Sequence, residues 1–241
     1  MCFTIEIHLS RKSIENRFPV NSSSLYDFDF NYFYRAFDNP LIPVIAMEDP
    51  ALVKLMHWGL IPAWVKSKDQ AEKIRRSTYN ARSETLHEKP SFREALGTGR
   101  CLIIAGGFFE WQQVHGKKIP WYITLKSGEP FAFAGLCESW RDSVSGEITR
   151  TCSIITTAAG PMMERIHNTK KRMPVILRRE REEEWISGDI SLLKRKQVLL
   201  PVVDSELSAH TVAPNLIQAG SNPSDPAIIS PYTYESPGTL F

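Results

Sequence analysis

Short runs of apolar residues recur along the whole chain, separated by polar stretches that contain glycine or proline. Most runs are shorter than a typical helix and rich in β-branched and aromatic residues, which is typical of buried strands. This pattern predicts strands near residues 3–9, 41–47, 52–59, 101–110, 119–125, 131–137, 151–157, 174–177 and 198–203. Helical signals are fewer and predict short helices at 92–97, 161–167 and 180–187, the first preceded by an S-x-x-E capping pattern at Ser91 and Glu94.

The order of these elements indicates the fold class. Few helices fall between successive strands, so repeated βαβ units are disfavoured. We expect an α+β fold: a single domain over residues 1–241, built on a curved, mostly antiparallel sheet or barrel with a few short helices. Residues 17–40 read as an irregular excursion and 215–241 as an extended C-terminal tail, and neither contains a convincing linker.

Composition narrows the class of protein further. The 241 residues are 42% hydrophobic, with 29 basic and 27 acidic side chains, which is typical of an ordinary soluble domain and disfavours a disordered or collagen-like chain. The longest apolar stretch, residues 101–109, is much shorter than the roughly 20 residues that span a bilayer. No apolar signal segment is recognisable, so we expect a cytoplasmic protein with no membrane partner.

Cysteine and histidine spacing gives no indication of a metal site. The four cysteines form no CxxC pair, and Cys101, Cys137 and Cys152 lie in apolar runs where buried thiols are expected. Five histidines lack the spacing of zinc ligands and are interpreted as structural or surface residues: His8, His57, His87, His115 and His210. We therefore predict neither a metal nor another cofactor.

Cys2 directly follows the initiator methionine and is the first candidate for chemistry. Removal of Met1 would leave a free amine and a thiol on one residue. An α-amine has a pKa near 7.7–8.0, so about a quarter of it is unprotonated near neutral pH and able to attack a carbonyl. An aldehyde captured as an imine can then close with the thiol into a five-membered thiazolidine. The alternative is that Cys2 is merely a small residue after methionine.

Three further polar residues stand next to predicted elements. Asn80 and Arg82 lie in the polar segment 79–85, where an amide can hold an amine or hydroxyl and a guanidinium can bind phosphate. Glu110 ends an apolar strand among aromatic residues, and burial there would raise its pKa toward values suited to proton transfer. The alternatives are a turn with surface charges and a glutamate that faces water.

His167 stands at the end of the predicted helix 161–167 and precedes a basic loop, a position suited to proton transfer near neutral pH. A structural histidine is the alternative. The loop belongs to the segment 165–179, which holds six basic residues and no acid; the segment 66–82 holds six basic residues and two acids.

These two segments could form a track for phosphates or merely a solvated face. Trp58 and Trp64 could stack on unpaired bases or belong to the core. The DNA-binding candidates are therefore Arg82, Trp58, Trp64, Lys170, Lys171 and Arg172.

Four motifs occur in a fixed order: Met1-Cys2, Trp58-Gly59-Leu60-Ile61-Pro62 with Asn80 to Thr85, Gly107-Phe108-Phe109-Glu110-Trp111, and His167 ahead of Arg172 to Leu177. Together they resemble the SOS response-associated peptidase (SRAP) family. The motifs run from residue 2 to about 177, and the rest of the family domain would extend to roughly 215. The chain departs from the common pattern in carrying Phe3-Thr4 where many members have Gly-Arg, and in having four residues, not one, between His167 and Arg172.

The resemblance implies an SRAP-like fold and a protein that binds abasic sites in single-stranded DNA, or at junctions with a duplex. It implies a thiazolidine crosslink through Cys2, autocatalytic removal of Met1 in a peptidase reaction, and lyase-like chemistry. By the same resemblance Asn80 positions the amine and sugar, and Arg82 grips phosphate. Glu110 assists imine chemistry, crosslink reversal and methionine removal, and His167 helps to open the sugar. The expected location is cytoplasmic, and nucleoid-associated when bound to DNA.

Two other functions use the same residues. In an N-terminal-nucleophile amidohydrolase the Cys2 thiol would attack an amide with its own amine as base, but the basic segments would have no role. A non-catalytic single-strand binder would use tryptophans and lysines and would not need Cys2.

Overall fold

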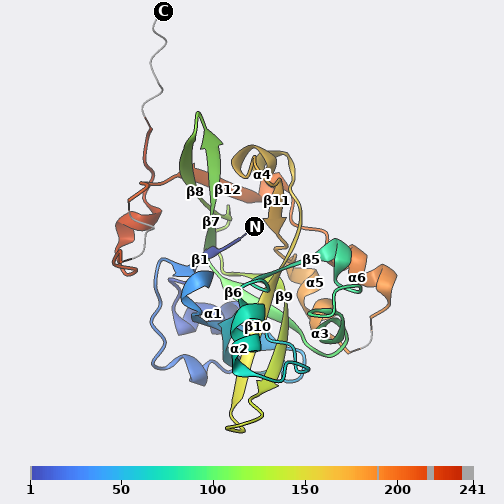
Figure 1. The fold of residues 1–241 in the computed structure, drawn as a ribbon. Coiled ribbons are helices and arrows are strands. Elements are labelled where there is room, and N and C mark those ends of the chain that lie inside the picture. The colour runs from blue at the N-terminus through green and yellow to red at the C-terminus, as the bar shows by residue number, and fades with distance from the viewer. Residues whose placement is uncertain (1, 189, 216–219, 235–241) are drawn as a thin grey trace, which may run out of the picture.

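The protein is described by a computed structural model that covers residues 2–188, 190–215 and 220–234 (Figure 1). Its strands are β1 (Thr4–Glu6), β2 (Tyr34–Arg35), β3 (Leu41–Ala46), β4 (Val53–Trp58), β5 (Asn80–Arg82), β6 (Arg100–Ala105), β7 (Gly107–Val114), β8 (Lys117–Leu125), β9 (Phe131–Arg141), β10 (Ile148–Ala158), β11 (Arg172–Pro174) and β12 (Leu207–Thr211). Its α-helices are α1 (Arg11–Arg17), α2 (Lys68–Arg75), α3 (Arg93–Thr98), α4 (Pro161–Ile166), α5 (Arg179–Ile186) and α6 (Leu192–Val198).

Five strands close into a barrel. The order is β10-β4-β3-β6-β9, and β9 pairs with β10 to complete the ring, in which β4–β10 is the parallel pair. Closure pairs the edges that an open sheet would leave free. Two short strands, β5 and β11, also pair with β10. The predicted α+β fold with a curved, mostly antiparallel sheet is confirmed.

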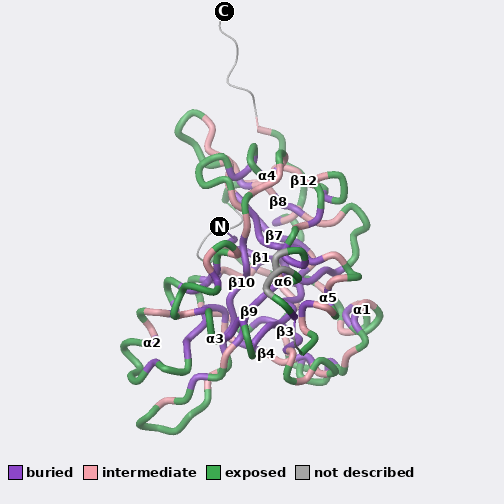
Figure 2. Tube along the Cα trace, turned by 90° about the vertical axis from the view of Figure 1, so that its right-hand side faces the viewer, coloured by how far each residue is buried: buried purple, intermediate pink, exposed green. Residues whose placement is uncertain are grey.

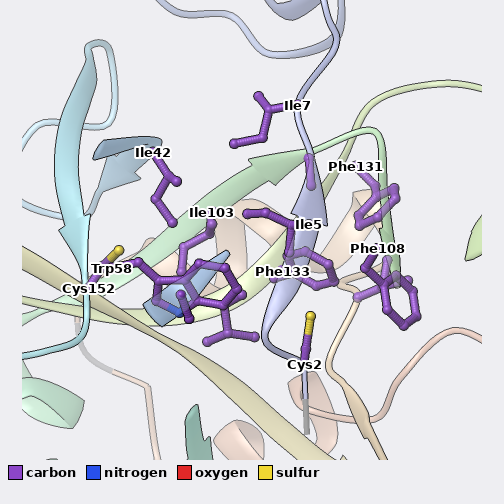
Figure 3. Close-up of a cluster of buried hydrophobic side chains, with 14 of the residues drawn as sticks. Cys2, Ile5, Ile7, Ile42, Trp58, Ile103, Phe108, Phe131, Phe133 and Cys152 are labelled. Atoms are coloured by element: carbon purple, nitrogen blue, oxygen red, sulfur yellow. The ribbon is translucent and has the colours of Figure 1, made fainter. Parts of the chain in front are cut away.

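A second sheet has the order β12-β8-β7-β1-β2 and is antiparallel throughout. In Figure 1, β7, β8 and β12 lie at one end of the molecule with α4 and β11, while α3, α5 and α6 gather at one side of the barrel. The two sheets share an apolar core that runs through the centre of the molecule (Figure 2). Ile5 and Phe108 of the second sheet meet Trp58, Ile103 and Phe133 of the barrel there (Figure 3).

The predicted strand at 101–110 is divided between the two sheets at Gly106. Residues before this glycine form β6 of the barrel, and residues after it form β7 of the second sheet. A side chain at Gly106 would collide with the carboxylate of Glu6, and one at Gly107 would collide with the ring of Tyr122. The two glycines therefore allow the close approach of neighbouring strands.

The predicted strand at 198–203 is wrong. Helix α6 ends at Val198, and its apolar continuation is a loop in which Leu199 and Val202 are buried but Leu200 and Val203 are exposed. The strand in this region is β12, which the hydrophobic pattern did not predict because most of its residues are polar or small. The predicted strand at 174–177 is displaced, because β11 ends at Pro174.

All three predicted helices are confirmed as α3, α4 and α5, and their ends differ from the predicted ends by at most one residue. The capping pattern is wrong, since Phe92 and not Ser91 precedes α3, without a side-chain cap. Helices α1 and α2 were missed because they are short and mostly charged; Ser10 and Ser67 cap them. In the described part of the chain, no helix combines the length and apolarity needed to cross a membrane.

The excursion at 17–40 and the described part of the tail both contribute residues that pair with or pack against the second sheet. Strand β2 pairs with β1, and the 3-10 turn Ala36–Asp38 follows it. In the tail, Ile228 is buried in a cluster with Phe109 and Tyr122. Residues 216–219 and 235–241 of the predicted tail lie outside the described residues.

Glu6 is a buried carboxylate that joins β1 to its neighbours. It is 4% exposed, and it accepts hydrogen bonds from the backbone N–H of His8 and from the Tyr122 hydroxyl, the latter at 3.2 Å. Burial raises the pKa of Glu6 to about 7, even though these hydrogen bonds act in the opposite direction.

This raised pKa predicts a pH-dependent stability. The folded protein holds the Glu6 proton more tightly than the unfolded chain does, so ionisation of Glu6 opposes folding, and stability falls as pH rises from about 4.5 to 7. In Glu6→Gln this fall should be smaller by ~1–3 kcal/mol. Urea unfolding of both proteins at several pH values measures the difference, and parallel pH profiles would contradict it.

Candidate functional site

Cys2 lies two residues before the start of β1 and is fully buried in the shared core. Figure 3 shows it below Ile5 and Phe133, with its sulfur directed into the apolar cluster. The thiol contacts the backbone oxygen of Thr4 at 3.7 Å as a weak donor. Burial first, and the charge of Glu110 second, raise the pKa of the Cys2 thiol far above its usual value. The thiol is therefore neutral in this structure.

Asn80 holds the backbone of Cys2 in place. It begins β5, where it pairs in parallel with Ile154 of β10, and its Nδ2 donates a hydrogen bond of 2.8 Å to the Cys2 carbonyl. Its Oδ1 is buried and accepts no hydrogen bond from the described residues. The amide thus fixes the start of β1 and presents one unused acceptor beside it.

Glu110 is brought to the same place by β7. Strand β1 pairs with β7 in antiparallel register, with Thr4 opposite Phe109, so the next residue along β7 lies close to the start of the chain. Successive side chains of a strand point to opposite faces, and Phe108 joins the core of Cys2 whereas Phe109 joins the tail cluster. Glu110 is 3% exposed, and burial raises its pKa, although the nearby His167 imidazole acts against this.

His167 comes from the end of α4 and faces Glu110. Its Nε2 lies 3.9 Å from Glu110 Oε2, and its Nδ1 lies 2.8 Å from the carbonyl oxygen of Arg172. A carbonyl only accepts hydrogen bonds, so Nδ1 carries a proton and Nε2 of the neutral ring is left as the acceptor toward Glu110.

The four residues between His167 and Arg172 form a loop that leaves the histidine at the site. Lys171 has a φ of 51°, and its N–H donates to the His167 carbonyl at 2.8 Å, which closes the loop. Asn168 docks it on β7, because its side chain accepts from the Gln113 N–H at 2.9 Å and donates to the Gln113 carbonyl at 2.8 Å. The longer spacing is therefore compatible with a histidine that faces Glu110.

Arg172 joins three segments around β10. Its guanidinium donates to both carboxylate oxygens of Glu84, at 3.0 and 2.9 Å, and to the carbonyl of Thr156 at 2.7 Å. Burial alone would raise the pKa of Glu84, but the hydrogen bonds from Arg172 hold it below its usual value. A phosphate at Arg172 would compete with this bidentate pair, so the residue acts here as a brace between β11 and the segment after β5.

The other predicted DNA contacts differ in their exposure. Arg82, Lys170 and Lys171 are exposed, and Trp64 is 38% exposed. Trp58 is fully buried, and its indole N–H donates to the Tyr79 carbonyl at 2.9 Å. A ring without exposed surface presents no face to a base, so Trp58 packs in the core in this structure.

A cavity of about 500 Å³ opens beside these groups, and both Glu110 and His167 line it. Its lining also includes residues that sequence reasoning missed, namely Phe3, Arg35, Phe37 and Lys118. Arg35 and Phe37 belong to the excursion without periodicity, and no local signal in the sequence identifies them. Nowhere among the described residues do three or more His, Cys, Asp or Glu side chains form a group able to hold a metal ion.

Comparisons with known proteins identify the family to which the chain belongs. The chain matches the family described as SOS response associated peptidase (SRAP) over residues 1–219. It is 44% identical over 177 residues to the abasic site processing protein YoqW of Bacillus subtilis (strain 168), covering 73% of this chain and 75% of that protein. The abasic site processing protein HMCES of Rattus norvegicus is 32% identical over 196 residues, which cover 69% of this chain and 54% of HMCES.

A solved structure of similar sequence has the same fold. A crystal structure of a protein from Bacteroides thetaiotaomicron superposes with a TM-score of 0.89 at 34% sequence identity, covering 96% of this chain and all of that one. A second, from Bordetella bronchiseptica, has a TM-score of 0.76 at 24% identity and supports the fold alone. On the family match and these identities, the chain belongs to the SOS response associated peptidase (SRAP) family.

Proposed function

We propose that this protein binds abasic sites in single-stranded DNA, including sites at junctions with a duplex, and captures the sugar aldehyde through Cys2 as a thiazolidine. The observation that carries the proposal is the hydrogen bond from Asn80 to the Cys2 carbonyl, which fixes the start of β1 close to the Glu110–His167 pair. The names of the relatives YoqW and HMCES support abasic sites as the target.

The reaction begins with removal of Met1, which itself lies outside the described residues. Water adds to the Met1 carbonyl carbon, the bond to the Cys2 nitrogen breaks, and the nitrogen leaves as an amine after it gains a proton. Glu110 in its ionised form would take the proton from water and return it to the amine. The buried acceptor Oδ1 of Asn80 can then receive a hydrogen bond from the new amine.

Capture of the aldehyde follows, and in it the amine of Cys2 reacts before the thiol. The amine attacks the aldehyde carbon, and loss of water gives an imine. The Cys2 sulfur then adds to the imine carbon while the thiol proton passes to the nitrogen, which closes the ring. The amine reacts first because its pKa lies near 8, whereas the pKa of the buried thiol is strongly raised.

Glu110 and His167 supply complementary proton transfers for opening the sugar. The closed deoxyribose must lose a proton from its anomeric hydroxyl and gain one at its ring oxygen. Burial favours the protonated, donating form of Glu110, and the ring of His167 would offer Nε2 as an acceptor when it carries its proton on Nδ1 alone. The two side chains therefore form a donor and acceptor pair within one cavity.

Exposed cations around the cavity would hold the DNA backbone. Arg82 lies two residues after Asn80 at the end of β5, and Lys170, which lines the cavity, lies with Lys171 in the loop after His167. Trp64, with part of its ring exposed, is available to stack on an unpaired base. Such contacts make affinity depend on salt.

The first test is covalent capture. Mixed with a single strand that carries one abasic site, the wild type should give a heat-stable shifted band, and Cys2→Ala should give none. Cys2→Ser keeps the amine and should give a band only after borohydride reduction of the imine. An undamaged strand is the control. Hydrolysis of an amide without a DNA adduct, or salt-dependent binding without one, would overturn the proposal in favour of an amidohydrolase or a passive binder.

A second test addresses the proton donated by Glu110. In protein prepared with Cys2 already at the N-terminus, Glu110→Gln should slow crosslink reversal about 10- to 100-fold near pH 6, with little change in DNA affinity. The wild type loses its donor as pH rises through the raised pKa of Glu110, so the gap should narrow toward pH 9. A ratio of rates that is constant with pH would contradict this role.

A third test separates His167 from Glu110. If Nε2 accepts the anomeric proton, His167→Ala should slow crosslink formation about tenfold or more on the closed sugar while binding is unchanged. A small open-chain aldehyde needs no ring opening and should react with the free N-terminus at the wild-type rate. Equal slowing on both aldehydes would argue for a merely structural histidine.

A further inference from the structure

An aromatic cluster with one exposed ring stands next to Cys2. Phe3 and Phe37 are stacked with their ring centroids 5.1 Å apart and an interplanar angle of 30°. Tyr79 supports both by its edge, at 6.3 Å from Phe3 and 5.6 Å from Phe37. Tyr79 is buried, yet Phe37 is 58% exposed. Stacked on Phe3 along one face, the Phe37 ring offers its remaining surface to solvent.

The backbone holds this pair at the reacting end of the chain. Phe3 is bonded directly to Cys2, and its carbonyl accepts a hydrogen bond of 2.9 Å from the N–H of Ala36, the residue before Phe37. Both rings line the same cavity as Glu110 and His167. A molecule that reacts at Cys2 therefore lies within reach of the exposed ring.

Cationic side chains line the cavity beside these rings. Arg35 stands opposite Thr4 in the β1–β2 pair, and Lys118 and Lys170 lie elsewhere on the lining, which includes Glu110 as its one carboxylate among the described residues. The Nε of Arg35 is 3.5 Å from Asp38, whose side chain is 60% exposed. The Arg35 side chain is 22% exposed, but water around the exposed Asp38 weakens this pair, so a phosphate can compete for the guanidinium.

We propose that Phe37, backed by Phe3, stacks on an unpaired base adjacent to the abasic sugar, and that Arg35 contacts the phosphate beside that base. The inference rests on the proposed function for the identity of the reacting sugar. It adds a binding site for the neighbouring nucleotide, and thus a requirement that the damaged strand carry a base next to the lesion.

The chemistry of the cavity favours a nucleotide over an apolar peptide. An exposed aromatic face combined with cations is the usual arrangement for single-stranded nucleic acid, since every base has a flat face and every nucleotide a negative charge. An abasic sugar leaves its neighbouring bases without one stacking partner. The Phe37 ring can replace that partner while the sugar reaches Cys2.

Binding without chemistry tests the stacking. The probe is a labelled single strand with a central tetrahydrofuran, a stable abasic analogue that has no aldehyde. A second strand carries a further tetrahydrofuran in place of the nucleotide on the 5′ side of the first. A third strand carries it on the 3′ side. For the wild type, removal of the base on one of these sides should weaken binding about 5- to 30-fold, as measured by fluorescence anisotropy.

The variants decide whether Phe37 is the ring that senses this base. Phe37→Ala should bind the first strand about 5- to 30-fold more weakly and should no longer distinguish the three strands, whereas Phe37→Tyr should behave as the wild type. Tyr26→Ala, which removes a 78% exposed ring that does not line the cavity, is the matched control and should change nothing. Wild-type binding by Phe37→Ala, or equal losses on base removal in both proteins, would overturn the inference.

Arg35 has its own readout. Arg35→Ala should weaken all three strands alike and lower the slope of log affinity against log salt by about one. An unchanged slope would remove Arg35 from the proposed site. Because these strands cannot crosslink, a failure of covalent capture by Cys2 leaves the stacking result unaffected, and a failure of stacking leaves capture unaffected.

Discussion

The pairing of β1 with its two neighbours is the constraint on which the site depends. The strand has only three residues, Thr4–Glu6, yet β7 and β2 pair with it on either side. The first pairing sets the start of the chain beside Glu110, and the second brings the excursion at 17–40 against Phe3. Gly106 leaves room for the Glu6 carboxylate of β1, and Gly107 leaves room for the Tyr122 ring of β8. These two small residues let β7 pack closely against both of its neighbours, and the pairing with β1 helps to place Cys2.

Strand β10 holds the segments that carry Asn80 and the loop after His167. It pairs with β5 in parallel and with β11 in antiparallel fashion, so it joins segments that are about ninety residues apart in the chain. Asn80 depends on the first pairing, and the loop after His167 depends on the second. The Arg172–Glu84 pair ties these segments together. A barrel strand therefore holds an amide and an imidazole at fixed positions around Cys2.

Much of this could be predicted where residues act through local pattern or chemistry. Apolar runs identify the barrel strands, and the residue types at Cys2, Asn80, Glu110 and His167 suggest their chemistry. Strand β2 could not be predicted, because two residues have no periodicity and their order comes from pairing with β1. For Trp58 the residue type is plain from the sequence, but its environment could not be predicted. Nothing local tells a stacking tryptophan from one whose N–H finds a backbone carbonyl in the core.

The burial of Cys2 also affects how long the residue survives. Peroxide attacks the thiolate, whereas the neutral thiol reacts slowly. In this structure the sulfur has no exposed surface, and its pKa is strongly raised. The same apolar cluster that orders the start of the chain would thereby slow the conversion of the sulfur to sulfenic acid.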